Sequence, residues 1–282
     1  MTDVVINCIC LQLDKWFDHL LPEGEAIWGV TSLAGEIFLL REKELDQVEV
    51  YDVITYCLLR RLTVPGLRSV ADMASCKHFL CIYISDDDGK CVHRLDVQAT
   101  ASTQWTTNDQ PCGLSVYASH NVLVTCHKVR KIKEFSSHGN LLRELTLPDD
   151  VIRPLHAIQT RENEFLVSHG GLGDAAHRVC KISADGRHIV HSHGGQPGSG
   201  HGQYNVPGRL AVDDNEFVFV VDRLNRRVRL LSPTLGHVRD IVSSDQLKWR
   251  PLRMCLDVQR NRLYVAENEW NNTSGRVVVS SV

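Results

Sequence analysis

The sequence of 282 residues lacks the features that mark several large classes of protein. Its formal net charge is −3, so it has no basic excess of the kind that dedicated nucleic-acid-binding domains carry. The longest apolar runs, such as residues 217–221, are as long as a strand and far too short to span a membrane. The first residues show no basic stretch followed by an apolar run, which a signal peptide requires. These absences predict a cytoplasmic protein without membrane attachment.

The cysteines also lack a pattern that would indicate a disulfide framework or a zinc ribbon. There are 10 of them, scattered and without a CxxC pair, and several alternate with apolar residues, as Cys8, Cys81 and Cys180 do. Free cysteine behaves as a small buried hydrophobic residue, and a cytoplasmic location keeps thiols reduced. We therefore expect reduced thiols, most of them in the core, and no disulfide-linked partner.

What the sequence does contain is a repeat marked by prolines. Pro22, Pro65, Pro111, Pro154, Pro207 and Pro251 follow one another at intervals of 43 to 53 residues. Each is followed by up to four short segments rich in β-branched residues, separated by Gly, Asn, Asp and Ser, and no segment keeps a helical period. Four strands in a unit of about 45 residues form one blade of a β-propeller.

The predicted fold is therefore all-β, a six-bladed β-propeller with four-stranded blades in a single domain, residues 1–282. The predicted blades span residues 22–64, 65–110, 111–153, 154–206, 207–250 and 251–282. The last unit ends after its third strand, and an open sheet edge promotes aggregation. Residues 4–11 form a β-rich run before the first unit, so we expect them to supply the missing strand and close the ring.

One unit carries motifs that resemble those of the NHL-repeat family. Residues 194–207 form a glycine-rich stretch that leads into Leu210-Ala-Val-Asp213, and residues 222–228 read Asp-Arg-Leu-Asn-Arg-Arg-Val, similar to the Asp-x-x-Asn-x-Arg-Val turn of the family. The spacing of the resemblance covers nearly the whole chain, whereas its motifs cover about a third. It implies a six-bladed propeller like the C-terminal NHL domain of tripartite-motif proteins, which binds proteins or RNA. No RING or B-box pattern is present, so ligase activity is not implied.

The resemblance assigns a structural role to Asp222, Asn225 and Arg227. In the family these residues hold a turn and tie neighbouring blades together. Asp and Asn side chains also satisfy backbone groups within turns. We expect them to stabilise the blade without contacting a ligand.

In a propeller, the loops between strands 2 and 3 and the loops that lead into each blade open on the same face, here called the lead-in face. In the last three units these loops combine arginine with tryptophan, a pairing that is enriched at interface hot spots and that also serves phosphate contact and stacking. The predicted binding face consists of Arg153, His156, Arg209, Arg223, Arg226, Trp249, Arg250, Arg253 and Trp270. The alternative is an ordinary solvated rim.

Within this face, Arg209, Arg253 and His156 each lie two residues after the proline of their unit, which predicts one anion-attracting patch at the channel mouth. Asp213 and Asp257 lie four residues further along the same strands, roughly 13 Å away in extended chain. We therefore expect both guanidinium groups to remain unpaired and available for a carboxylate or phosphate.

Metal sites are weakly indicated. His169, His191, His193 and His201 lack the supporting groups of a zinc site. Residues 86–89, Asp-Asp-Asp-Gly, resemble the start of a calcium loop but lack its final glutamate. Strand 1 of the units offers Arg68, Gly113, His156, Arg209 and Arg253 to the channel, a set that repels a cation. We expect no metal and no cofactor.

The sequence also contains no G-x-S-x-G elbow and no P-loop. Together these features predict that the protein is not an enzyme. We expect a monomeric binding platform whose lead-in face engages an acidic protein partner. The alternatives are an RNA-binding module that takes single-stranded RNA and, further behind, a hydrolase or lyase with a metal in the channel.

Overall fold

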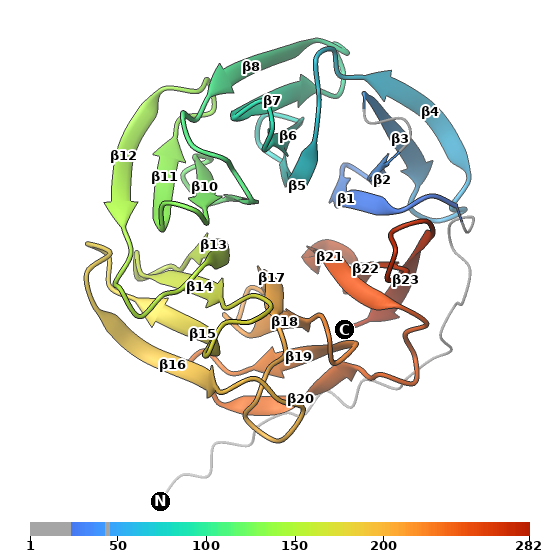
Figure 1. Cartoon of the computed structure of the whole chain (residues 1–282). Coiled ribbons are helices and arrows are strands. Elements are labelled where there is room, and N and C mark those ends of the chain that lie inside the picture. The colour runs from blue at the N-terminus through green and yellow to red at the C-terminus, as the bar shows by residue number, and fades with distance from the viewer. Residues whose placement is uncertain (1–23, 43–45) are drawn as a thin grey trace, which may run out of the picture.

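The structure of the chain, a computed structural model, describes residues 24–42 and 46–282, which form six antiparallel sheets around a central axis (Figure 1). The first three sheets contain, from the axis outward, β1 (Ile27–Leu33), β2 (Glu36–Arg41), β3 (Gln47–Asp52) and β4 (Leu58–Thr63); β5 (Val70–Cys76), β6 (Cys81–Asp86), β7 (Cys91–Asp96) and β8 (Ser102–Thr106); β9 (Gly113–Val116), β10 (Val122–Cys126), β11 (Lys131–Phe135) and β12 (Leu141–Thr146). The predicted all-β, six-bladed propeller is confirmed.

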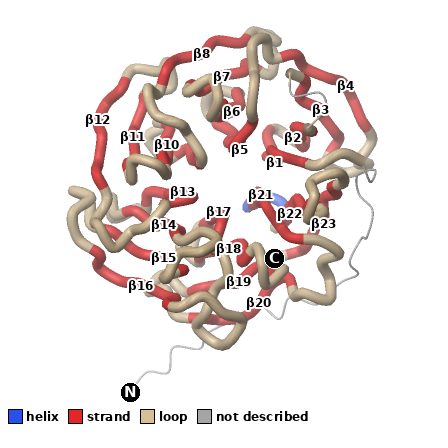
Figure 2. Tube along the Cα trace, in the orientation of Figure 1, coloured by secondary structure: helices blue, strands red, loops and turns tan. Residues whose placement is uncertain are grey.

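The other three sheets contain β13 (Pro154–Gln159), β14 (Phe165–His169), β15 (His177–Ile182) and β16 (Ile189–Gly195); β17 (Pro207–Val212), β18 (Val218–Asp222), β19 (Arg227–Leu231) and β20 (His237–Val242); β21 (Arg250–Asp257), β22 (Arg262–Asn268) and β23 (Gly275–Ser281). A short 3-10 helix, η1 (Val258–Arg260), lies between β21 and β22 (Figure 2). Within the described residues no helix is long and apolar enough to cross a membrane.

The burial of the strands follows from their radial order. The second strands β6, β10, β14 and β18 are buried at every position, so both of their faces lie against neighbouring blades. The outer strands β4 and β12 are largely exposed. A strand that is buried on both faces reads as a continuous apolar run, which explains why the second segment of each unit is the most hydrophobic.

The core is divided into six clusters, each between two consecutive blades. Phe38 and Met73 belong to the cluster between the first and second blades, for example. Ile27 and Tyr264 belong to the cluster between the first and the last. Ile27 and Asn268 also exchange two hydrogen bonds of 2.9 and 3.1 Å across that junction. The ring is therefore closed by packing between its first and last blades.

The last sheet has three strands among the described residues. The predicted fourth strand, residues 4–11, lies outside the described residues and stays a prediction.

Eight cysteines lie in the described residues, and none of them forms a disulfide. Five are buried, Cys112 and Cys255 are half-buried, and Cys57 is exposed. A thiol reagent should therefore modify Cys57 rapidly in the folded protein, while the buried thiols react only after denaturation. We expect Cys57→Ser to remove one equivalent from the fast phase of a thiol titration. A fast phase of unchanged size would contradict this exposure.

Candidate functional site

The inner strands of the blades share an irregularity that turns side chains toward the axis. The register of the first two strands shifts between Val70 and Asp72, between Pro154 and His156, and between Pro251 and Arg253. Corresponding shifts occur at the start of β1 and β17. A bulge of this kind re-aims a side chain next to a site. Five of the six inner strands therefore present irregular backbone at the same end of the propeller.

At this end lies a pocket of about 200 Å³, here called the axial pocket. It is lined by residues from five blades: Ala71, Asp72, Cys112, His127, Arg153, Leu155, His156, Gly208, Arg209, Arg223, Leu252 and Arg253. His127 and Arg223 lie in loops between second and third strands, and Arg153 lies in the loop that leads into β13. The axial pocket therefore opens on the lead-in face.

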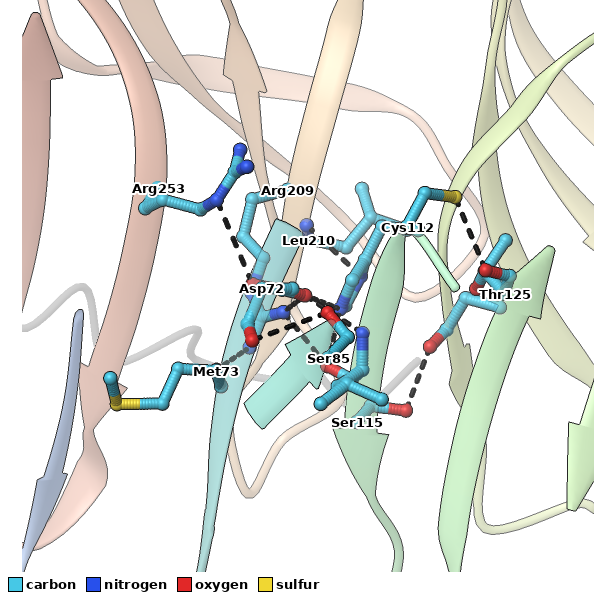
Figure 3. A network of polar contacts seen from close by, with 12 residues as sticks. Asp72, Met73, Ser85, Cys112, Ser115, Thr125, Arg209, Leu210 and Arg253 are labelled. Atoms are coloured by element: carbon cyan, nitrogen blue, oxygen red, sulfur yellow. Dashed lines mark hydrogen bonds and ion pairs between the residues drawn. The ribbon is translucent and has the colours of Figure 1, made fainter. Parts of the chain in front are cut away.

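Among the described residues, Asp72 of β5 is the only acidic side chain that lines the axial pocket, and it is 3% exposed. Its carboxylate forms an ion pair with Arg209 of β17 and accepts a hydrogen bond of 2.8 Å from the Leu114 backbone N–H. Arg209 also donates to the carbonyl oxygens of Leu114, at 2.8 Å, and Met73, at 3.1 Å (Figure 3). Arg209 thus ties the fifth blade to the second and third across the axis.

This pairing corrects the expectation that the channel arginines are unpaired. Asp213 and Asp257 do not neutralise Arg209 and Arg253, because Asp213 caps its own turn and Asp257 pairs with Arg260. The partner instead comes from another blade. Arg253 lies 3.9 Å from Asp72 and donates to the carbonyl oxygens of Trp28 and Leu252 at 2.9 and 3.0 Å.

The second blade contributes Asp72 to the channel, and not Arg68 as predicted from the sequence. Val70 pairs with Asp86 as Pro207 pairs with Asp222, so Val70 and not Pro65 occupies the position of the later prolines. Arg68 consequently stays exposed, and Asp72 reaches the axis. The alternating run 70–76 could have indicated this inner strand. Its first residue, Val70, lies five residues after Pro65, from which the strand was counted.

His156 lines the axial pocket as expected, but as a neutral side chain. Its Nδ1 accepts a hydrogen bond of 3.3 Å from the Leu210 backbone N–H, and its Nε2 donates one of 2.9 Å to the Leu114 oxygen. Burial lowers the pKa of His156 to about 4. Both ring nitrogens are therefore occupied at neutral pH, and the anion-attracting charge expected of His156 is absent.

The charge of the axial pocket comes from Arg153, Arg209, Arg223 and Arg253, opposed by Asp72. Arg153 lies 3.4 Å from Asp174 at the rim. The Arg223 side chain forms no hydrogen bond or ion pair with any described residue, and its Nε is buried. Burial and the positive charges of Arg253 and Arg250 lower the pKa of Arg223 to about 10, so it remains protonated. The arrangement leaves a buried excess of positive charge, which favours an anionic ligand.

The remaining residues of the predicted binding face lie further from the axis, on the fifth and sixth blades. The Arg250 guanidinium lies 4.8 Å from the ring centre of Trp270 and donates to the Trp270 carbonyl oxygen at 2.9 Å. Trp270 is 67% exposed. Trp249 is covered by Lys248 at 4.3 Å, and Arg226 donates to the Lys248 oxygen at 3.5 Å. The structure thus separates the predicted face into the axial pocket and an outer group of arginine and tryptophan.

Asp222 ends β18, Asn225 lies in the loop that follows, and Arg227 begins β19. The Asp222 carboxylate accepts hydrogen bonds from the Asn205 backbone N–H at 2.7 Å and from Asn225 and Arg227 at 2.8 Å. Arg227 also donates to the Gln203 carbonyl oxygen at 3.1 Å. These contacts attach the glycine-rich segment to its blade.

The histidines considered as a metal cluster do not converge: His169 contacts Cys180, His193 contacts Tyr204, and His201 contacts His237. Across residues 24–42 and 46–282, one group of three potential ligands lies close together: Asp86, Cys91 and His93. This group was not predicted from the sequence, although the alternation of Cys91 and His93 on one strand places both side chains on the same face.

No family model matches the sequence, and no curated protein matches it. Many solved structures share its fold. The hydrazine synthase of Kuenenia stuttgartiensis has a TM-score of 0.66 at 14% identity, covering 92% of this chain and 96% of that one. A streptogramin B lyase has a TM-score of 0.62 at 12% identity, covering 95% and 86%. A Bacteroides thetaiotaomicron protein of unknown function has a TM-score of 0.68 at 16% identity, covering 92% and 70%.

At these identities the likeness establishes the fold alone. It nevertheless overturns the prediction that the chain is not an enzyme, because a lyase and a synthase are among the proteins that share its propeller. The absence of the G-x-S-x-G and P-loop motifs excludes only the enzyme classes that use them, since one fold can carry many different activities.

Proposed function

We propose that the protein recognises an acidic protein segment on its lead-in face, with a carboxylate of that segment entering the axial pocket. The observation that carries the proposal is the excess of positive charge in a pocket of about 200 Å³, where Asp72 and the rim residue Asp174 oppose four arginines. Arg223 is the residue best placed to receive the ligand, because its guanidinium is protonated and without a partner among the described residues. A carboxylate there would form charge-assisted hydrogen bonds. The proposal concerns recognition and holds whether or not the bound group then reacts.

The outer group of arginine and tryptophan extends the proposed binding surface beyond the axial pocket. Trp270 and Arg250 provide an exposed ring and a cation beside the axial pocket, and Arg250 is close enough to lower the pKa of Arg223. Tryptophan and arginine are the residues that most often dominate binding energy at protein interfaces. Membership of the NHL-type propellers, a cytoplasmic location and a monomeric state belong to the same proposal, and the free thiols support a reducing compartment.

Single-stranded RNA is the second candidate ligand, and the observation that favours it is again the exposed Trp270. A base can stack on such a ring while arginines contact its phosphates. RNA binding depends steeply on salt through the release of counterions, so comparison at two ionic strengths separates the two ligands.

The test uses Arg223→Glu, with Arg161→Glu as its control. Arg161 is exposed and lies between the first and second strands of its blade, on the opposite face. Loss of hydrogen bonds to a charged group, about 1.5–3 kcal/mol, corresponds to a loss in affinity of roughly 10- to 150-fold. We therefore expect Arg223→Glu to weaken binding of a labelled Asp/Glu-rich peptide by at least about 10-fold, measured by fluorescence anisotropy. Arg161→Glu should leave it unchanged.

Equal affinity of wild type and Arg223→Glu, at equal melting temperature, would refute the axial pocket as the binding site. Tighter binding of a uridine-rich oligonucleotide than of the peptide, with a steep salt dependence, would replace the protein ligand by RNA.

A further inference from the structure

The second blade contains a buried group of three potential metal ligands, unrelated to the axial pocket. Asp86 ends β6, and Cys91 and His93 lie on β7. The Cys91 Sγ lies 3.4 Å from the His93 Nε2, which lies 3.5 Å from the Asp86 Oδ2. The ligand atoms all fall within 4.8 Å of one another, and the three residues are 0%, 8% and 1% exposed in chain order.

Comparison with other blades shows what this group replaces. Asp86 pairs with Cys91 in the register in which Asp222 pairs with Arg227 and Glu267 with Arg276. In those two blades the buried carboxylate forms an ion pair with the arginine opposite it. In the second blade a cysteine occupies the place of the arginine.

Asp86 consequently lacks a permanent cation. Its carboxylate accepts three backbone N–H groups, from Arg68 at 2.9 Å, Ser69 at 3.2 Å and Gly89 at 2.7 Å. Its side-chain ion-pair partner among the described residues is the His93 imidazole, not a guanidinium or ammonium group. Burial of a charge is costly unless an opposite charge or a metal compensates it.

We propose that Asp86, Cys91 and His93 bind a zinc ion, which cross-links β6 and β7 in the way that the acid–arginine pairs do in the fifth and sixth blades. Bonds of about 2.0–2.3 Å at tetrahedral angles place neighbouring ligand atoms about 3.3–3.6 Å apart, close to the two separations in the structure. The set of one sulfur, one imidazole nitrogen and one carboxylate oxygen is suited to zinc.

The charges also balance. Binding converts the Cys91 thiol to a thiolate and releases one proton to solvent, so Zn²⁺ is neutralised by the thiolate and the Asp86 carboxylate. Gln104 lies opposite His93 on β8, with its Oε1 3.7 Å from the Cys91 Sγ, so its amide oxygen is a candidate for the fourth position. The three ligands are themselves buried, as in structural zinc sites, while Gln104 lies on the exposed outer strand of the blade.

The fourth blade provides an internal control. His169 and Cys180 repeat the imidazole–thiol contact, with 3.4 Å between Nε2 and Sγ, but Arg178 lies opposite His169 where a third ligand would be needed. A cationic side chain in that place opposes metal binding. The same pair of ligand types without a carboxylate should therefore bind no metal.

The experiment titrates the untagged full chain, freed of metal by chelation, with Co²⁺ as a spectroscopic substitute for Zn²⁺. We expect one equivalent to produce the visible bands of tetrahedral cobalt and a thiolate charge-transfer band. Both should persist in Cys180→Ser and be lost in Cys91→Ser. Zn²⁺ should likewise raise the melting temperature of wild type and Cys180→Ser but not of Cys91→Ser.

Absence of a thiolate band in the wild-type chain would overturn the proposal, and this outcome does not depend on the folding of any variant. Retention of the band in Cys91→Ser, or its loss in Cys180→Ser, would also overturn it by placing the metal elsewhere.

Discussion

Replacement of Asp72 by alanine is expected to lower the free energy of unfolding by about 3–5 kcal/mol, because it leaves a buried cation uncompensated. Asp72 and Arg209 are 4% and 11% exposed at their side chains, so the Arg209 guanidinium is poorly solvated once the carboxylate is lost. The variant also leaves the Leu114 backbone N–H without its acceptor. Urea denaturation followed by circular dichroism measures the loss.

The double variant Asp72→Ala/Arg209→Met separates the buried charge from the loss of packing. Removal of both charges should recover at least about 2 kcal/mol, since replacement of a buried ion pair by apolar side chains is often close to neutral. Asp149→Ala is the matched control, because Asp149 is 94% exposed and its ion pair with Arg130 should contribute less than about 1 kcal/mol. A double variant no more stable than Asp72→Ala alone would show that Arg209 is not the residue that requires Asp72.

The architecture was accessible from the sequence because it depends on short-range patterns. Each blade repeats the same order of β-rich segments, and the fully buried second strands produce the strongest apolar runs, such as β18. The register of the inner strands was harder to predict from the sequence. Proline marks the start of the inner strand in the last three blades, but Val70 occupies the corresponding position in the second, so counting from Pro65 selected Arg68 in place of Asp72.

The candidate site was accessible only in part because its decisive contacts join residues far apart in the chain. Arg209 and Asp72 are 137 residues apart and meet only because the ring brings the second and fifth blades together across the axis. The spacing within one strand excludes Asp213 as the partner of Arg209, but it carries no information about Asp72. The same limit applies to Arg223, whose position at the pocket depends on the loop that Asp222 and Asn225 fix.

The residues that recur from blade to blade and the residues that line the axial pocket occupy different positions of the blade. The acid–arginine pair recurs in the fifth and sixth blades, where it serves the same structural purpose. The axial positions instead differ from blade to blade, with Asp72, His156, Arg209 and Arg253 at related places. A ring of non-identical side chains around one axis can recognise an asymmetric ligand, and the repeat only supplies the frame.

The same frame makes the protein sensitive to acid through two buried histidines. Burial lowers the pKa of both His156 and His169 to about 4, whereas an unfolded chain has a histidine pKa near 6.5. Below pH 6.5 the unfolded state therefore binds protons that the folded state does not. The stability is complete above pH 6.5 and is lost as the pH falls toward 4, by roughly 3 kcal/mol for each histidine.

The free energy of unfolding of the wild-type protein is accordingly expected to fall by at least about 4 kcal/mol between pH 6.5 and 4.5, measured by urea denaturation at several pH values. His156→Gln and His169→Gln should each remove about 2 kcal/mol of this fall, whatever their stability at pH 7, because each removes one proton-binding site of the unfolded state. His188→Gln, at an exposed position, should keep the wild-type slope. Carboxylates that titrate below pH 5 contribute equally to all four proteins, so the difference in slope isolates the histidines. Identical slopes in all four would show that His156 and His169 take up protons in the folded state as readily as in the unfolded one.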